Sequence, residues 1–151
     1  MGYATFGEVL EFAIGRENAA VDFYRELSGI AAFAAQKSTL AEFIAMERGH
    51  AAMLEAMKAR GTVKLSASTA VDLGAARRVE ATDRPPAGMT FQDILTAAAS
   101  KEARSFELYG RLAREAGDPG IRETFERLAG EESRHRAYFQ DLYEREVARD
   151  N

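Results

Sequence analysis

The amino-acid sequence repeats itself after 85 residues without a gap. The acidic, aromatic and histidine positions that recur at this spacing include Glu17 and Glu102, Tyr24 and Tyr109, Glu47 and Glu132, and His50 and His135. Apolar positions recur with them, for example Val9 with Ile94 and Leu27 with Leu112. A fixed period of this kind indicates that the chain contains structurally similar units. Because the sequence holds only two copies, it indicates one duplication rather than a solenoid array.

Within each copy, apolar residues recur at spacings of three and four, which is typical of amphipathic helices. The pattern predicts four helices, at about residues 6–32, 35–60, 91–116 and 119–148. The run Gly117-Asp118-Pro119 separates the last two, because Gly suits a helix end, Asp an N-cap and Pro the first helical position. The sequence therefore predicts an all-α fold in a single domain over residues 1–151, a four-helix bundle made of two helical hairpins.

The segment between the two predicted hairpins, residues 62–89, is much longer than the roughly 2–8 residues that join neighbouring helices of a bundle. A connection of this length predicts a long crossover that runs the length of the bundle. It would make the second and third helices parallel. The segment also suggests a short helix near residues 69–78.

Six side chains of metal-ligand type lie inside the apolar stripes of the predicted helices. They are Glu17, Glu47, His50, Glu102, Glu132 and His135. The two histidines of the chain each follow a glutamate by three residues, and residues i and i+3 share one face of a helix. A tight hairpin also brings Glu17 level with Glu47, because both lie at similar distances from the turn.

The simpler interpretation is a helical bundle with acids on its surface, and glutamates such as Glu26, Glu55 and Glu107 fit it. It does not suit the four glutamates in the stripes, because ionised carboxylates in a dry core are costly unless they are paired or bind a metal. No lysine or arginine recurs on the stripes to pair with them. The sequence thus predicts a dinuclear metal site. Carboxylates with imidazole and no thiolate suit iron or manganese, and zinc can substitute.

Composition and charge argue against other classes of function. The net charge is −4 and no basic stripe is present, which argues against nucleic-acid binding. No apolar run approaches the ~18 residues of a membrane span, and the first residues lack the pattern of a signal peptide. There are no cysteines, so disulfides and thiolate metal sites are excluded. We expect a cytoplasmic protein with no nucleic-acid or membrane partner.

With these motifs the chain resembles the ferritin-like di-iron carboxylate proteins, and most closely their rubrerythrin-like branch. In such bundles two helices each supply a glutamate and the other two each supply Glu-x-x-His, which is the arrangement of all six positions above. The resemblance covers residues 5–148 and implies a ferritin-like bundle that binds two iron ions. The implied terminal ligands are Glu17 with His50 and Glu102 with His135, and the implied bridging ligands are Glu47 and Glu132.

The resemblance also suggests a role for Tyr24 and Tyr109, each seven residues after the first glutamate of its copy. They are similar to tyrosines that donate hydrogen bonds to ligand carboxylates, and the alternative is that they are core tyrosines. Two features depart from the family pattern. Ser105 stands where rubrerythrins usually carry a further glutamate, and the lack of cysteine excludes the rubredoxin domain that many of them carry. The electron donor must therefore be external.

The resemblance implies a non-haem di-iron oxidoreductase that oxidises Fe(II) with dioxygen or hydrogen peroxide, a peroxidase or ferroxidase of oxidative stress. Two alternatives stay open: a non-catalytic iron-binding or iron-delivery protein, and a structural bundle that the metal only stabilises. The first copy is also bulkier than the second at Phe12 and Phe23, and Phe33 adds to this surplus. Because exposed apolar patches often mark interfaces, the surplus predicts a homodimer contact.

Overall fold

The computed structural model describes residues 3–4, 6–60, 71–72 and 89–147. The chain forms two compact units, Met1–Arg78 and Val79–Asn151, and each contains one of the helical hairpins expected from the repeat. The boundary between the units falls in the predicted connection. The prediction of one domain over residues 1–151 stays a prediction.

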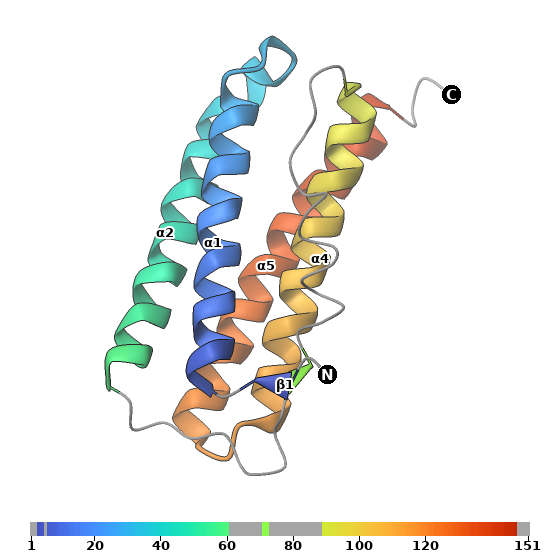
Figure 1. The fold of residues 1–151 in the computed structure, drawn as a ribbon. Coiled ribbons are helices and arrows are strands. Elements are labelled where there is room, and N and C mark those ends of the chain that lie inside the picture. Colours follow the sequence, from blue (N-terminus) through green and yellow to red (C-terminus); the bar gives the residue numbers. More distant parts are fainter. Residues whose placement is uncertain (1–2, 5, 61–70, 73–88, 148–151) are drawn as a thin grey trace. The chain divides into compact units, whose positions relative to one another are not determined.

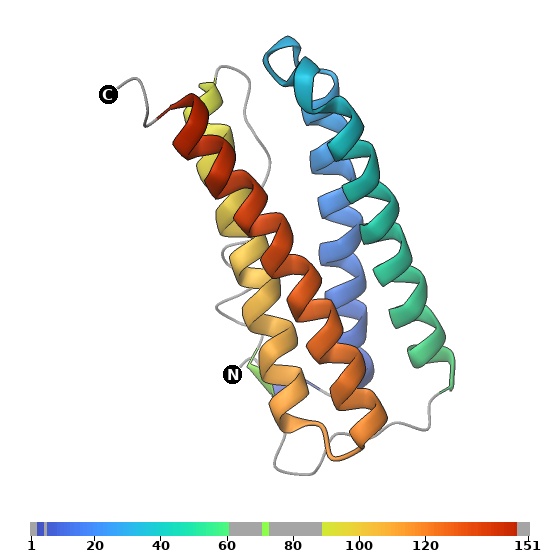
Figure 2. The same cartoon turned by 180° about the vertical axis from the view of Figure 1, so that it is seen from behind.

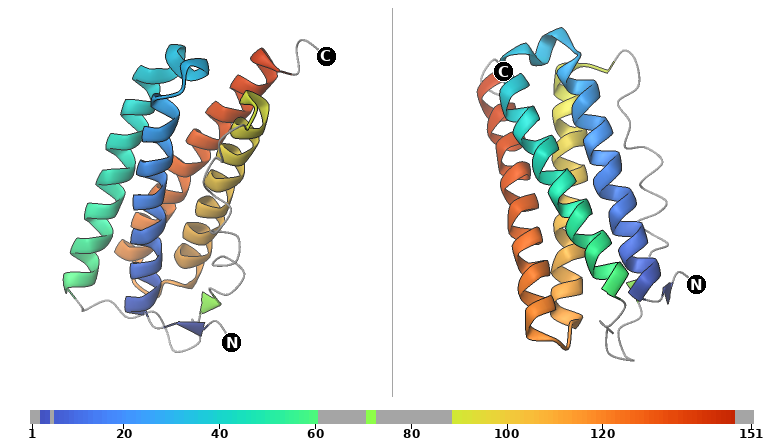
Figure 3. Two further views of the ribbon diagram at one scale, coloured as in Figure 1. Left: turned by 45° about the horizontal axis from the view of Figure 1, so that its top comes forward. Right: turned by 90° about the vertical axis from the view of Figure 1, so that its left-hand side faces the viewer.

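The first unit is built on two helices, α1 (Phe6–Ser28) and α2 (Lys37–Arg60). They pack side by side as a hairpin (Figure 1). A 3₁₀-helix, η1 (Ala31–Gln36), makes the turn between them, as both views of Figure 3 show. The sequence predicted helices over 6–32 and 35–60, so the first ends earlier and the second begins later than expected.

The early end of α1 follows from local hydrogen bonding. The amides of Gly29 and Ile30 bond to carbonyls three residues back, at 3.1 and 3.0 Å, which tightens the last turn and stops the α-helical ladder. The η1 segment then brings Phe33 to the interior, where its side chain is fully buried. Residues 31–34 therefore form a turn that the Phe33 side chain anchors in the interior, and they do not extend the α-helix.

A two-residue strand pair also belongs to the first unit. Strand β1 (Tyr3–Ala4) pairs antiparallel with β2 (Val71–Asp72), with Tyr3 opposite Asp72 and Ala4 opposite Val71. The short helix predicted near residues 69–78 is therefore wrong at Val71 and Asp72, which extend to pair with the beginning of the chain. The remainder of that helix and most of the predicted crossover lie outside the described residues.

The second unit is also a hairpin of two packed helices, α4 (Phe91–Glu115) and α5 (Pro119–Glu146), seen from behind in Figure 2. The predicted spans 91–116 and 119–148 differ from these bounds by one or two residues at their C-terminal ends. The short connection leaves no room for a packed turn like that of the first unit.

Local capping explains why the boundaries of the second hairpin could be read from the sequence. The Thr90 hydroxyl accepts a hydrogen bond from the amide of Asp93 at 3.1 Å and caps α4. The Asp118 carboxylate accepts one from the amide of Ile121 at 3.0 Å, and Pro119 occupies the first turn of α5. Both arrangements satisfy amides that a helix start leaves without intrahelical partners.

The aromatic surplus of the first copy lies in the interior. Phe12, Phe23 and Phe33 are 9%, 3% and 0% exposed. They form no exposed apolar patch, so the argument for a homodimer contact from these residues is wrong, and the homodimer itself stays untested. Among the described residues, the large apolar side chains that are exposed are Met46 and Phe106.

None of the described helices combines the length and the apolar character that crossing a lipid bilayer requires.

Candidate metal centre

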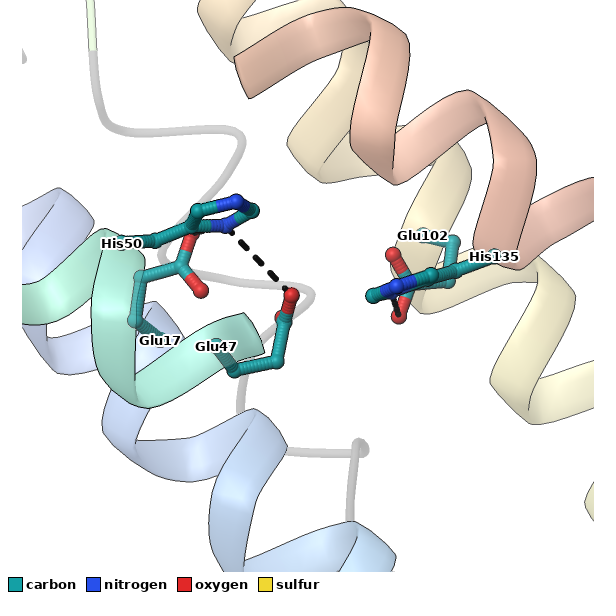
Figure 4. A network of polar contacts seen from close by, with 5 residues as sticks. All are labelled: Glu17, Glu47, His50, Glu102 and His135. Carbon is teal, nitrogen blue, oxygen red and sulfur yellow. Dashed lines mark ion pairs between the residues drawn. The ribbon is translucent and has the colours of Figure 1, made fainter. Parts of the chain in front are cut away.

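In the first hairpin, three ligand-type side chains converge in the interior. Helix α1 supplies Glu17, and α2 supplies Glu47 and His50 from adjacent turns of one face. All three are at most 3% exposed. The Nδ1 atom of His50 lies 3.5 Å from a carboxylate oxygen of Glu17 and 3.5 Å from one of Glu47. Figure 4 shows both carboxylates turned towards the imidazole ring.

The second hairpin repeats this arrangement with α4 supplying Glu102 and α5 supplying Glu132 and His135. Their exposed fractions are 1%, 0% and 2%. The Nδ1 atom of His135 lies 3.6 Å from a carboxylate oxygen of Glu102, and the two side chains face each other in Figure 4. All six residues predicted from the sequence are thus buried, three within each hairpin.

The spacing of these atoms suits a shared metal ion. In each hairpin, one ligand atom from each of the three side chains lies within 4.8 Å of the other two. Two ligands that each bind an ion at about 2.1 Å, with an angle near 110°, lie roughly 3.4 Å apart. The observed Nδ1–Oε1 distances of 3.5 and 3.6 Å are close to this value. Each hairpin therefore presents a preformed half-site of two carboxylates and one imidazole.

Each half-site has a buried basic neighbour that the sequence reasoning missed. Arg16 and Lys101 are 4% and 3% exposed, and each directly precedes the first glutamate of its half-site. The two bases lie beside the apolar stripes, on which no lysine or arginine recurs, so the sequence analysis did not consider them. The apolar stripes considered were too narrow, because α1 and α4 are also buried along the flank that carries these bases. The recurrence of a basic residue at the 85-residue spacing was the signal that could have revealed them.

One base per hairpin still does not balance two carboxylates. With neutral histidine, each buried set keeps one net negative charge, which a bound cation would compensate. The donor set also fits iron, because carboxylate oxygen and imidazole nitrogen without thiolate suit iron and manganese.

The two tyrosines singled out in the sequence are both core residues by burial. Tyr24 is fully buried, with its ring centroid 5.7 Å from those of Phe23 and Phe43. Tyr109 is 1% exposed and stacks on Phe125 at 6.2 Å. These contacts agree with the alternative of packed core tyrosines, and a role of the hydroxyls towards the carboxylates stays a prediction.

Comparison with known proteins agrees with this class of site. The family model described as Rubrerythrin matches residues 93–150, the greater part of the second hairpin. The crystal structure of a candidate ferritin-like diiron-carboxylate protein from Thermotoga maritima is similar over 97% of this chain and 98% of that chain. Its TM-score is 0.70 and its sequence identity is 21%. No protein with a curated description matches the chain.

These likenesses show which fold and which family the chain resembles. The fold is the ferritin-like four-helix bundle of two hairpins, as the sequence predicted. The resemblance to the rubrerythrin-like branch of the ferritin-like superfamily is confirmed as well, with its family match on the second hairpin.

Proposed function

We propose that the protein is a non-haem di-iron oxidoreductase that oxidises Fe(II) with dioxygen or hydrogen peroxide. The observation that carries the proposal is the pair of equivalent buried half-sites, each with two carboxylates and one imidazole whose ligand atoms converge within 4.8 Å. The Rubrerythrin match and the ferritin-like fold support the same assignment. A cytoplasmic location, a role in oxidative stress and an external electron donor are further parts of the proposal.

For the six side chains we propose the roles that the resemblance implies. The proposed terminal ligands are Glu17 with His50 and Glu102 with His135, and the proposed bridging ligands are Glu47 and Glu132. In each hairpin the second glutamate and the histidine lie on adjacent turns of one rigid helix, which holds their donor atoms in place without a conformational change.

When bound, two Fe(II) ions supply two electrons, which with two protons reduce one hydrogen peroxide to two water molecules while both ions become Fe(III). The chain contributes geometry and a dry environment. The side chains of both half-sites are at most 3% exposed, so they have little access to water.

The deciding experiment combines metal analysis with stoichiometry. Protein loaded anaerobically with Fe(II) should hold about two ions per chain, as six ligands shared by two ions require. One equivalent of hydrogen peroxide per chain should oxidise both ions, with near-ultraviolet absorption of bridged Fe(III). One ion per chain, or ions that peroxide leaves in the ferrous state, would contradict the proposal.

Turnover then separates the catalyst from an iron-binding or iron-delivery protein. Sustained consumption of peroxide with an added chemical reductant identifies a peroxidase. Sustained consumption of peroxide only when Fe(II) is added identifies ferroxidase chemistry. Stable iron binding without turnover under either condition favours delivery. The matched control is the pair Glu42→Gln and Glu126→Gln, exposed acids on α2 and α5, which should leave both activities unchanged.

A further inference from the structure

Helices α4 and α5 border two surface grooves, one near each end of the second hairpin. The groove near the turn is lined by Arg114 and Arg122, with Glu126 as the acid among its lining residues. The groove near the beginning of α4 is lined by Asp141 and Glu144, and its described lining residues include no base. All five charged side chains are exposed. We call the first the basic groove and the second the acidic groove.

Both grooves lie on one face of the hairpin. Arg122 and Glu144 are 22 residues apart on α5, about six helical turns, so they project from the same side of that helix. On α4, Ala99 lines the acidic groove and Phe106 lines the basic groove, seven residues or about two turns apart. Because α4 and α5 run side by side (Figure 2), the grooves are the two ends of a single surface.

The first hairpin is bridged where the second has its acidic groove. Thr96 and Tyr143 line the acidic groove, and Glu11 and Lys58 occupy the equivalent positions of the repeat. The Nζ atom of Lys58 lies 3.3 Å from a carboxylate oxygen of Glu11, so this ion pair connects α1 and α2. Ala59 stands at the position of the glutamate that lines the groove. The acidic groove therefore belongs to the second copy and is not a property of the repeat.

We propose that this face is where two copies of the chain meet in a symmetric dimer, with the basic groove of each copy against the acidic groove of the other. A two-fold axis that crosses the helices midway between the grooves reverses the face end to end, so both contacts form together. The charges that line the grooves sum to +1 and −2, which makes these contacts attractive. Because the complementary charge lies on the same face, the partner that fits is a second copy of this chain. The inference goes beyond the proposed function and does not depend on bound metal.

The size and relief of the face suit a dimer interface. Between Leu95 and Arg114, α4 is roughly 30 Å long, and two helices side by side are about 20 Å wide. The flat area is therefore roughly 600 Å², close to the ~800 Å² per partner of a standard interface. Phe106, which is 38% exposed, supplies an apolar contact. Gly110 and Gly130 line the basic groove beside it and carry no side chain that would fill the groove.

Charge reversal followed by mixing tests the interface. Arg122→Glu and Glu144→Arg each place like charges at both contacts of the dimer, so each should raise the dimer dissociation constant by more than about 100-fold. An equimolar mixture of the two variants should restore association, because opposite charges then meet at both contacts. Sedimentation velocity of the full chain, with and without metal, measures association. Glu144 is the acid to reverse, since Asp141 already pairs with Arg145 at 3.0 Å.

Matched variants separate this face from other surfaces. Arg25→Glu and Glu55→Arg reverse exposed charges on the first hairpin and should leave the dimer unchanged, alone and mixed. Gly130→Leu should fill the basic groove and weaken the dimer without a change of charge, because a Cβ at Gly130 meets no neighbouring atom within 4 Å. Arg122 also donates a hydrogen bond to a backbone carbonyl at 3.2 Å, so Arg114→Glu is the second reversal if Arg122→Glu does not fold.

The outcomes separate this inference from the proposed function. Loss of the dimer in both reversals and its return in the mixture support the inference. A wild-type chain that is monomeric at micromolar concentration overturns it. A dimer that both reversals and Gly130→Leu leave intact lies on another surface and overturns it as well, and so does a mixture that stays monomeric. Association is measured apart from metal content and peroxide oxidation, so each of these failures leaves the proposed di-iron function standing.

Discussion

The two hairpins hold the same half-site but close their turns with different chemistry. Phe33 and Asp118 occupy the same position of the repeat. Phe33 is fully buried in a 3₁₀ turn, whereas Asp118 is exposed and caps the next helix. The comparison shows that the geometry of the half-site does not depend on how the chain reverses at the end of the hairpin.

The core beside the half-sites differs in a compensating way. At two equivalent core positions the first hairpin has Leu40 and Phe43, and the second has Phe125 and Leu128. In each copy the phenylalanine contacts the tyrosine that recurs in the repeat. Phe43 meets Tyr24 edge-on, and Phe125 stacks on Tyr109. An exchange that keeps total volume is tolerated by a core. The six predicted ligand positions show no such exchange between the copies, as expected for donor atoms that must lie at fixed separations to share an ion.

The largest expected effect concerns the turn of the first hairpin. Phe33→Ala should reduce the free energy of unfolding by about 3–5 kcal/mol, the usual cost of emptying a fully buried phenylalanine site. Urea unfolding followed by circular dichroism measures the loss. A cost below about 1 kcal/mol would mean that the 3₁₀ turn is not anchored by this ring, and the contrast with Asp118 would disappear.

The next test asks whether the half-sites are equivalent. His50→Ala and His135→Ala should each weaken the binding of one of the two ions by more than about 100-fold. Losing a residue that only hydrogen-bonds to a metal ligand already lowers metal affinity by about 10–100-fold, and losing the ligand itself should cost more. Isothermal titration with Co²⁺ gives the affinities. Gly49→Ala and Arg134→Ala, at exposed neighbours of the histidines, are the controls. If one histidine variant loses both ions and the other loses none, the equivalence of the two hairpins is wrong.

A third prediction uses the buried charge. Glu47→Ala combined with Glu132→Ala leaves one carboxylate and one base in each hairpin, so the buried charges balance without metal. The double variant should lose metal binding and yet be about 1–2 kcal/mol more stable than the metal-free wild type at neutral pH, since removing an uncompensated buried charge often stabilises a fold. Thermal unfolding in the presence of a chelator checks this. A double variant that melts well below metal-free wild type would show that these glutamates are structural.

The smallest effect concerns the second turn. Asp118→Ala removes the N-cap of α5 and should cost about 1 kcal/mol, with Asp118→Asn costing only a few tenths. Urea unfolding of both variants and of Phe33→Ala compares how much each turn contributes to the free energy of unfolding. A loss at Asp118 as large as that at Phe33 would contradict the view that one turn is packed and the other only capped.

Much of this architecture could be predicted from the sequence, because its signals are local or periodic. The bounds of α4 and α5 were predictable to within two residues, since Thr90 and Asp118 cap helices through amides three residues away. The convergence of the six ligand-type side chains within their hairpins followed from the helical period and the 85-residue repeat. Repeat, period and cap each depend on residues close in sequence or at a fixed spacing, so one sequence suffices to find them.

Only the tertiary structure decided which flanks are buried and where the apolar excess goes. Arg16 and Lys101 look like surface bases until the burial of their helix flank is known. Phe33 looks like the end of a helix until it packs into a turn, and Val71 pairs with residues near the start of the chain. These features depend on neighbours that are distant in sequence, because burial and strand pairing are properties of contacts and not of a residue's own helical or extended preference.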